Sequence, residues 1–375
     1  MIIATIFWIS LILLAYTFIG YPLIIKVLAE VIGKGTRFNG EYLPAVSIIL
    51  SVYNEEEVIE RKIANVTALD YPADKLEFII VSDCCSDRTD ELIRLHENDR
   101  IRLLVQTERS GKTKNLNRGV AEARGEIMVF TDANAMFDRD AVKKMVRHFA
   151  DPDVGLVSGK SVYLDATGSV TSGGAYRRYE DFIKESESRI GGIIGADGAI
   201  YALRKSCYTH LIPEYINDFI HTIQVVLTGG RAISDDEAIC REEAEESGSG
   251  ELRRQTRIMS QSWLIFLSQF GLLLKGGKLV YLWQFISHKF LRWLTVPLMA
   301  VLFASSVMLL PSGLCYQAFF IGQVLFFVSV FFGSRAQGGF LRVPYLFILL
   351  HYAALVGLFK YLTGNVYATW NPRNN

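Results

Sequence analysis

The sequence predicts an α/β fold: a mostly parallel sheet flanked by helices, to which amphipathic helices and about four transmembrane helices are added. Two observations support this prediction. From Pro44 to about residue 257, short β-rich runs alternate with helical stretches, the pattern of a right-handed wound sheet with ligands at the carboxyl ends of its strands. Toward both ends of the chain, apolar segments reach the length that a bilayer core demands.

Composition narrows the classes of function. The chain has 375 residues, of which 50% are hydrophobic, and its 39 Lys and Arg balance 39 Asp and Glu. Without a basic excess the chain lacks the charge that draws a protein to phosphodiester backbones, so we expect no nucleic-acid partner. The five cysteines fit no disulfide or zinc spacing and suit a reducing cytoplasm as free thiols.

The amino-terminal segment, residues 1–25, carries no charge and is predicted to be a transmembrane helix. It lacks the basic start and the cleavage site of a signal peptide, so we expect the chain to retain it. Lys26, Lys34 and Arg37 follow it, and the positive-inside rule then places the predicted α/β domain, residues 44–260, in the cytoplasm.

The carboxyl-terminal third changes character. Residues 261–292 mix apolar and charged positions, which favours amphipathic helices at the membrane surface. Three candidate spans follow, at 293–310, 314–333 and 343–363, before a tail at 364–375. Together with the amino-terminal segment they make four predicted spans.

Polar residues follow each of the first two predicted strands. Asn54 and Glu55 come after the run "VSIILSV" and could accept hydrogen bonds from a base or a ribose, or simply begin a helix with Asn54 as its cap. Asp83 comes after "EFIIVS" and stands too early to cap the helix that begins near Asp87. Helix capping therefore does not explain Asp83.

The segment "ERSGKTKNLNRGV" holds a tight turn, Gly111, followed by a cation, Lys112. This pair suits a nucleotide phosphate, although a lysine in a solvated loop would give the same pattern. The segment is not a P-loop, because the upstream glycine of G-x-x-x-x-G-K-[ST] is missing.

The run "EIMVFTDAN" ends in Asp132 and Asn134. Alternate residues of an extended backbone share a face, so a carboxylate and an amide oxygen are offered on one side. Mg²⁺ and Mn²⁺ prefer oxygen ligands and commonly bridge a carboxylate to substrate phosphates. The alternative is an Asx turn that caps the next helix, but Asp138 is better placed for that cap. We therefore interpret Asp132 and Asn134 as candidate metal ligands.

A fourth candidate, Asp218, precedes the helical run "FIHTIQVVLTGG". A carboxylate at this place could complement the helix dipole or serve as a general base, and spacing alone does not decide between them. His221 shares the same helical face but is more often a packing histidine than a ligand.

Seven motifs in order carry a family resemblance: "SVYNEEE", "VSDCCSDRTDE", "GKTKNLN", "FTDAN", "GADGAIYALRK", "INDFIHTIQVVLTGG" and "RRQTRI". With the flanking apolar segments they resemble the membrane-embedded family 2 glycosyltransferases of the cellulose synthase, hyaluronan synthase and poly-N-acetylglucosamine synthase type. The resemblance covers essentially the whole chain and implies the GT-A fold.

The resemblance implies a role for each donor-binding residue. Asp83 would contact the nucleotide base, Tyr53 and Glu55 would line the uridine site, and Lys112 would lie near uridine or its phosphates. The family's D-x-D metal motif reads D-A-N here, so Asp132 would be the principal ligand of Mg²⁺ or Mn²⁺.

In the same metal motif, Asn134 would be the altered ligand. One negative charge fewer should weaken metal affinity without abolishing it. The family's catalytic aspartate corresponds to Asp218, preceded by Asn217 where the family has an acid.

The family's last motif, Q-x-x-R-W, is the most altered. Arg254 stands in place of the glutamine, Arg257 keeps the arginine, and Ile258 replaces the tryptophan. Arg257 would still pair with the diphosphate, because a guanidinium is always charged and forks onto phosphate oxygens. Ile258 cannot stack on a sugar ring as the tryptophan does, which argues against long processive synthesis.

The resemblance implies a glycosyltransferase that inverts the anomeric configuration and uses a nucleotide sugar, in the first place a UDP-sugar. The acceptor would be a lipid-linked or growing glycan in extracellular polysaccharide biosynthesis at the lipid bilayer. Three alternatives stay open: a processive synthase with translocation, a polyprenyl-phosphate monosaccharide synthase, and a non-catalytic nucleotide-binding scaffold. Gln317, Gln323, His351 and Tyr352 could line a path for a polymer, although the two glutamines could also bond to a neighbouring helix.

Overall fold

The computed structural model describes residues 1–164, 174–243, 248–336 and 342–366. The chain forms two compact units. The helical unit contains Met1–Ile24, Ser247–Trp263 and Trp283–Val366, and the sheet unit contains mainly Ile25–Glu246 and Leu264–Leu282.

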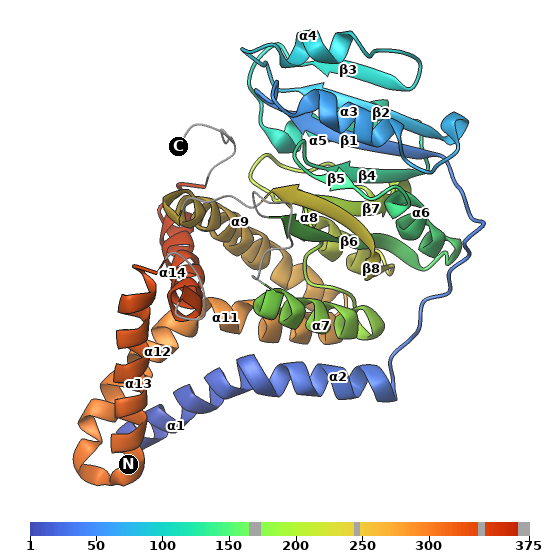
Figure 1. The fold of residues 1–375 in the computed structure, drawn as a ribbon. Coiled ribbons are helices and arrows are strands. Elements are labelled where there is room, and N and C mark those ends of the chain that lie inside the picture. Colours follow the sequence, from blue (N-terminus) through green and yellow to red (C-terminus); the bar gives the residue numbers. More distant parts are fainter. Residues whose placement is uncertain (165–173, 244–247, 337–341, 367–375) are drawn as a thin grey trace. The chain divides into compact units, whose positions relative to one another are not determined.

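The sheet unit is built on eight strands in the order β3-β2-β1-β4-β7-β6-β8-β5 (Figure 1). The strands are β1 Val46–Val52, β2 Leu76–Ser82, β3 Ile101–Val105, β4 Ile127–Thr131, β5 Met136–Phe137, β6 Val154–Leu164, β7 Ile200–Arg204 and β8 Arg231–Glu243. The pairs β2–β3, β1–β2, β1–β4 and β6–β8 are parallel, whereas β7 runs antiparallel to β4 and β6, and β5 runs antiparallel to β8. The α/β class is thus confirmed, and the parallel order holds through the first half of the sheet.

The first strands are hydrophobic on both faces, as parallel strands covered by helices must be. The sequences "VSIILSV" and "LEFIIVS" are buried at nearly every position. Val52 at the end of β1 lies opposite Ser82 at the end of β2, and Leu50 lies opposite Thr131 at the end of β4. The carboxyl ends of these three strands therefore lie along one edge of the sheet.

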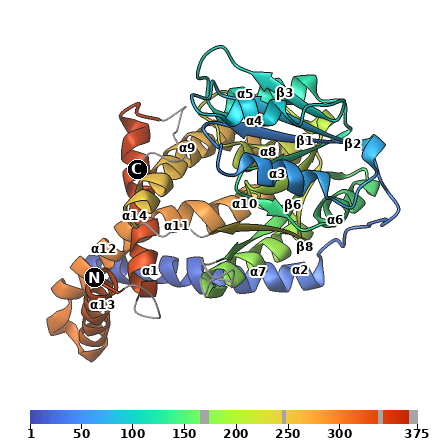
Figure 2. The ribbon, with the colours of Figure 1, turned by 45° about the horizontal axis from the view of Figure 1, so that its top comes forward.

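Helices cover both faces of this sheet. They are α3 Ile59–Thr67, α4 Thr89–Arg94, α5 Lys112–Glu122, α6 Ala141–Val146, α7 Gly174–Ile190 and α8 Asn217–Leu227. One core cluster joins alternate strand residues such as Ile48 and Ile80 to α3, α4 and α6, and a second joins Ile49 and Ile79 to α5 and α8. Figure 2 shows α3 lying against β1 and β2.

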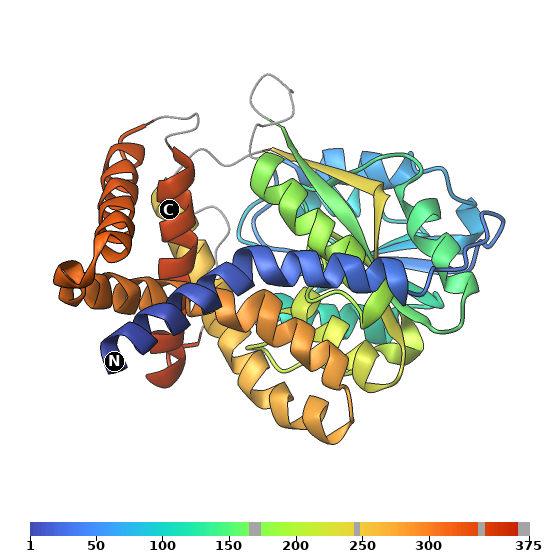
Figure 3. The ribbon, with the colours of Figure 1, turned by 90° about the horizontal axis from the view of Figure 1, so that it is seen from below.

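Beneath the sheet, the part of α2 that belongs to this unit lies beside α7 (Figure 3). The Nζ atom of Lys26 is 5.7 Å from the ring centre of Phe182, and the amide of Lys34 donates to the carbonyl of Arg189 at 2.8 Å. These contacts fix the chain segment that leads into β1 to α7, one of the helices that cover the sheet.

Three helices among the described residues are long and apolar enough to cross a membrane: Ile2–Val31, Leu314–Gly333 (α13) and Arg342–Leu362 (α14). The first combines α1 Ile2–Ala15, a π-helical turn Tyr16–Gly20 and α2 Tyr21–Val31, so it extends beyond the predicted residue 25. Pro22 follows this turn, and a π-turn is one way in which a helix accommodates a proline that removes a backbone donor.

The span predicted at 293–310 is not one straight helix. Helical residues Leu279–Trp293, made of α10 Leu279–Phe285, a π-turn and α11 Leu291–Trp293, meet α12 Thr295–Met308 at an angle of 60°. Pro297 explains the break, because a proline ring clashes with the carbonyl four residues earlier, here that of Trp293. Within the described part of the chain there are thus three candidate spans, or four if this bent pair is counted as one span.

Within the helical unit, both glutamines singled out in the candidate spans bond to protein. Gln323 donates to the Ser306 hydroxyl of α12 at 3.0 Å, and Gln317 donates to the Leu310 carbonyl at 2.9 Å. Both glutamines thus follow the alternative in which they hold neighbouring segments together.

Close packing in this unit involves the long helix α9, Gly248–Lys275, which crosses the predicted boundary at residue 260. The Trp263 indole donates to the Ala354 carbonyl of α14 at 3.0 Å. A Cβ added at Gly357 would lie 2.6 Å from the Met259 side chain and 2.8 Å from the Ser260 nitrogen. Glycine therefore allows the backbones of α9 and α14 to approach each other.

Candidate functional site

The edge where β1, β2 and β4 end brings together the residues predicted to hold a nucleotide and a metal. Tyr53 follows β1, Asp83 follows β2 and Asp132 follows β4. The strand order β3-β2-β1-β4 makes this the point where the winding of an α/β sheet reverses, which is where such folds bind their ligands.

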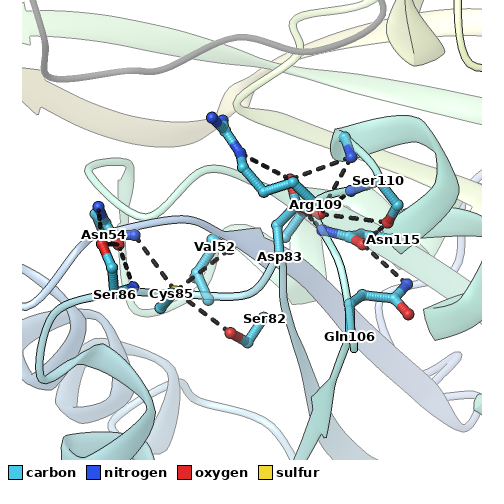
Figure 4. A network of polar contacts seen from close by, with 12 residues as sticks. Val52, Asn54, Ser82, Asp83, Cys85, Ser86, Gln106, Arg109, Ser110 and Asn115 are labelled. Carbon is cyan, nitrogen blue, oxygen red and sulfur yellow. Dashed lines mark hydrogen bonds and ion pairs between the residues drawn. The ribbon is translucent and has the colours of Figure 1, made fainter.

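Asp83 is the centre of a network that fixes the glycine–lysine turn (Figure 4). Its side chain is buried, one carboxylate oxygen accepts the backbone amide of Ser110 at 2.7 Å, and both oxygens accept that of Gly111 at 3.1 Å. Gly111 has a φ of 85°, a conformation that favours glycine. Asn115 extends the network, since its amide oxygen accepts from Gln106 at 3.0 Å.

Arg109 covers the side chain expected to line the base site. Its guanidinium carbon lies 3.6 Å from the ring centre of Tyr53, and its Nε lies 3.8 Å from an Asp83 oxygen. Sequence reasoning missed Arg109, although a cation just before the Gly111–Lys112 turn was visible in the sequence.

Asn54 and Glu55 do not begin a helix, because α3 starts only at Ile59. The Asn54 side chain instead accepts the Ser86 amide at 2.9 Å and donates to the Ser86 hydroxyl at 3.0 Å. The Glu55 amide donates to the Thr89 hydroxyl at 2.8 Å. The loops after β1 and β2 are therefore tied to each other, and the capping alternative for Asn54 is wrong.

Asp132 forms an ion pair with Lys112. The Lys112 Nζ lies 2.5 Å from a carboxylate oxygen of Asp132, and both side chains are about two-fifths exposed, at 42% and 39%. Residues 133 and 134 form a turn, in which the Ala135 amide donates to the Asp132 carbonyl at 3.3 Å, so the backbone here is not extended as expected. Asn134 is exposed on this turn. Asp138 was expected to cap the next helix, but the N-cap of α6 is Asp140. The Asp138 carboxylate instead accepts two hydrogen bonds from Arg241 of β8, at 2.8 and 3.0 Å.

Asp218 lies in the first turn of α8 and is half-buried beside the loop that leads into β7. A Cβ on Gly198 would lie 3.2 Å from one of its oxygens, and its other oxygen, Oδ1, is shielded from solvent without a hydrogen-bond partner. Burial raises the pKa of Asp218 to about 6, with the charges of Asp197 and Asp132 adding to the rise and Lys112 opposing it. A carboxyl group with this pKa is suited to accept a proton near neutral pH.

Asn217 and His221 connect the start of α8 to Tyr201 of β7. The Asn217 amide donates to the Tyr201 hydroxyl at 2.6 Å, and that hydroxyl lies 3.0 Å from Nδ1 of His221. Burial lowers the pKa of His221 to about 3, so the imidazole stays neutral at physiological pH. His221 is a packing residue, as expected.

Two further acids were missed by sequence reasoning. Asp197, between Ala196 and Gly198, accepts the Ser161 hydroxyl at 2.8 Å. Glu242 of β8 has an oxygen shielded from solvent without a hydrogen-bond partner. Burial, together with the charges of Asp197 and Asp132, raises the pKa of Glu242 to about 7. An acid between two small residues just before an apolar strand was the available signal for Asp197.

The donor set suits a divalent cation that is shared with a phosphate ligand. In the described parts of the chain, no three His, Cys, Asp or Glu side chains converge to hold a metal alone. Asp132 and Asn134 offer two oxygens, and the raised pKa values of Asp218 and Glu242 reflect in part an excess of negative charge around Asp132. A cation with diphosphate oxygens as further ligands would relieve that excess.

Arg254 and Arg257 lie on α9 within the helical unit, whereas the other seven predicted site residues belong to the sheet unit. Ile258 is on the same helix and is half-buried. The structure thus brings Tyr53, Asp83, Lys112, Asp132 and Asp218 into one unit and does not add the two arginines to it.

Comparison with known proteins places these observations in context. Residues 47–200 match the family model of glycosyl transferase family 2, and residues 127–360, more than half of the chain, match that of glycosyl transferase family group 2. A poly-beta-1,6-N-acetyl-D-glucosamine synthase of Staphylococcus aureus is 32% identical over 183 residues, which are 47% of this chain and 43% of that protein. Glycosyltransferase AglE of Haloferax volcanii is 31% identical over 153 residues, 39% of this chain and 49% of that protein.

The chain therefore matches about half, or less, of the length of these relatives. Among solved structures, a mannosyltransferase of Pyrobaculum calidifontis in complex with GDP-Man and Mn²⁺ superposes with a TM-score of 0.70, covering 95% of this chain and 99% of that one. At 22% sequence identity this likeness concerns the fold.

Proposed function

Because this chain belongs to the family 2 glycosyltransferases, we propose that it is a membrane enzyme that transfers a sugar, with inversion, from a UDP-sugar to a lipid-linked or growing glycan acceptor in extracellular polysaccharide assembly. The observation that carries the proposal is Asp218. Asp218 is half-buried, and one of its carboxylate oxygens is shielded from solvent without a hydrogen-bond partner. Burial raises its pKa to about 6, and it lies in the same unit as Asp132 and Lys112.

Asp218 is the proposed general base. As the acceptor hydroxyl oxygen forms its bond to the anomeric carbon, its proton passes to the Asp218 carboxylate. The bond between the anomeric carbon and the diphosphate oxygen breaks, and its electron pair leaves with the nucleoside diphosphate. One displacement at one carbon inverts its configuration.

The departing diphosphate needs positive charge around it. Lys112 is the first candidate to supply this charge. It stands at the start of α5, where the backbone amides and the helix dipole also favour an anion. Asp132 and Asn134 would hold Mg²⁺ or Mn²⁺, which neutralises diphosphate charge when bound. Arg254 and Arg257 are proposed as further phosphate-binding residues on the strength of the motif alone.

The nucleoside is proposed to bind at the edge formed by Tyr53, Glu55 and Asp83. Tyr53 offers an aromatic face, and Arg109 lies over that face at 3.6 Å. Asp83 uses its carboxylate to bind the 110–111 backbone, yet its Oδ2, which accepts the Gly111 amide, has a second lone pair that can also accept from a base.

The acceptor is proposed to be presented at a lipid surface. Helices Ile2–Val31, Leu314–Gly333 and Arg342–Leu362 support a membrane location, and Lys26, Lys34 and Arg37 support a cytoplasmic active site. The glutamine bonds within the helical unit and Ile258 in place of a tryptophan favour addition of one or a few sugars over extrusion of a long polymer.

The test is a panel of UDP- and GDP-sugars, incubated with the full chain and a membrane lipid extract and scored for released nucleoside diphosphate with and without Mn²⁺. We expect metal-dependent release from a UDP-sugar, and a product whose anomeric configuration is inverted. Asp218→Asn should bind UDP but release none from the donor. Full turnover by Asp218→Asn would remove Asp218 from the mechanism, and mass analysis of the product distinguishes single additions, polymer and a polyprenyl-phosphate sugar.

A further inference from the structure

Lys62 is a buried cation in the sheet unit that the mechanism above does not use. It lies on α3, its side chain has 0% exposure, and it sits among core residues of the first cluster such as Ile59 and Ile63. Lysines are almost never fully buried, because removing an ammonium group from water is costly unless it is well bonded. Burial accordingly lowers the pKa of Lys62 to about 7.

The partners of Lys62 lie on either side of the candidate metal ligands. Its Nζ donates to the hydroxyl of Thr131 at 2.8 Å and to the carbonyl of Ala135. Thr131 is the last residue of β4, and Ala135 immediately precedes β5. One ammonium group therefore ties together the two ends of the loop that carries Asp132 and Asn134.

Asn65, one turn further along α3, holds the next part of the chain in a different way. Its amide donates to the Phe137 carbonyl and accepts the Phe137 amide, both at 2.9 Å. The Lys62 ammonium also lies 4.3 Å from the ring centre of Phe137. Helix α3 thus holds the metal loop through Lys62 and the following strand through Asn65.

We propose, on the basis of the function proposed above, that Lys62 is a positioning residue for the transfer reaction: its buried ammonium holds the Thr131–Ala135 loop in the shape that presents Asp132 and Asn134 to a divalent cation. A neutral apolar side chain would fill this part of the core without burying a charge. The two polar acceptors, both in the loop of the metal ligands, explain why a lysine stands there instead.

The experiment compares Lys62→Met with the unchanged full chain. Mn²⁺ binding is measured by the electron paramagnetic resonance of free Mn²⁺ in the presence of UDP, and UDP binding is measured separately in the absence of metal. Loss of a residue that orients metal ligands typically costs about tenfold or more in metal affinity, so we expect the half-saturating Mn²⁺ concentration to rise by about that factor. Metal-free UDP affinity should change by less than about twofold, because the Asp83 network does not involve Lys62.

Two variants serve as controls. Lys75→Met removes another lysine of the same unit that donates to a backbone carbonyl, that of Leu43 at 2.9 Å, and should leave Mn²⁺ binding unchanged. Asn65→Ala removes the two bonds from the same helix to Phe137 of β5, and should lower the melting temperature without moving the Mn²⁺ half-saturation. Should Lys62→Met not fold, Lys62→Gln, which keeps one neutral donor, is expected to fold with a half-saturation raised about threefold or more.

A Mn²⁺ half-saturation within about twofold of the unchanged chain in the folded variant would overturn the role of Lys62 and leave the proposed function standing. An unchanged chain that binds no Mn²⁺ with UDP would overturn both. If the half-saturating Mn²⁺ concentration rose equally in Asn65→Ala, Lys62 would support the fold in general and would not specifically position the metal ligands.

Discussion

The ammonium of Lys112 lies 2.5 Å from a carboxylate oxygen of Asp132, so the first residue of α5 neutralises the acid that follows β4. A divalent cation at Asp132 must compete with this ion pair. Lys112→Met removes the competitor, and we expect the nucleotide-free protein to bind Mn²⁺ about two- to fivefold more tightly, the range of an exposed ion pair.

Equilibrium dialysis with Mn²⁺ measures this change. Lys114→Met is the matched control, because Lys114 is an exposed lysine on the same helix. Weaker Mn²⁺ binding by Lys112→Met in the absence of nucleotide would show that Lys112 does not compete for Asp132.

Asn134→Asp restores the second carboxylate of the family's metal motif. A unit charge about 4 Å from another in water contributes about 1 kcal/mol, so a divalent cation should bind about fivefold more tightly or better. Isothermal titration with Mn²⁺ in the presence of UDP measures the difference. Asn134→Ala should shift affinity in the opposite direction, and equal affinities for the Asp and Ala variants would exclude residue 134 as a ligand.

The raised pKa of Asp218 predicts a pH profile for the transfer reaction. A base must be ionised to act, and burial raises the pKa of Asp218 to about 6. The kcat/KM for transfer should therefore rise about tenfold per pH unit below pH 6 and level off above it. A profile without an inflection between about pH 5 and 7 would contradict this environment for the base.

The same burial predicts that Asp218 lowers stability at neutral pH. Its folded-state pKa lies above the unfolded value of 3.8, so the folded state binds the proton more tightly, and stability falls as pH rises through about 6. Asp218→Asn should then be more stable than the unchanged chain at pH 8, by about 1 to 2 kcal/mol, with the difference vanishing near pH 4. Thermal melts in detergent at both pH values measure this, and a destabilised variant at pH 8 would contradict it.

Gly357 and Gly322 form a matched pair in the helical unit. A methyl group at Gly357 would lie 2.6 Å from the Met259 side chain, whereas one at Gly322 of α13 would meet nothing within 4 Å. Gly357→Ala should force α14 from α9 and cost about 1 to 3 kcal/mol, seen as a lower melting temperature. Gly322→Ala should be neutral or slightly stabilising, and equal melting temperatures would argue against the close approach.

The first half of the sheet could be predicted from sequence because its strands are buried on both faces and their polar residues begin where the strands end. Asp83 and Asp132 were found by that rule. The second half could not, because the antiparallel pairing of β4 with β7, which puts Ile200 opposite Thr131, has no local signature. The acid between two small residues was visible at Asp197, but only this pairing brings the segment before β7 to the end of β4.

Other differences had a visible cause. Pro297 stood inside the span predicted at 293–310, and its effect on the carbonyl of Trp293 could have been anticipated. The role of Lys62 could not, because a lysine within a polar helical stretch reads as solvent-exposed until its acceptors, Thr131 and Ala135, are brought to it by folding.

The hydrogen bonds that the amides of Ser110 and Gly111 donate to Asp83 have a consequence for the kinetics of nucleotide binding. The turn that carries Lys112 is already ordered in the folded protein, so binding of the donor does not incur the entropy cost of ordering it. Association of a nucleotide should then include no separate step in which this turn becomes ordered.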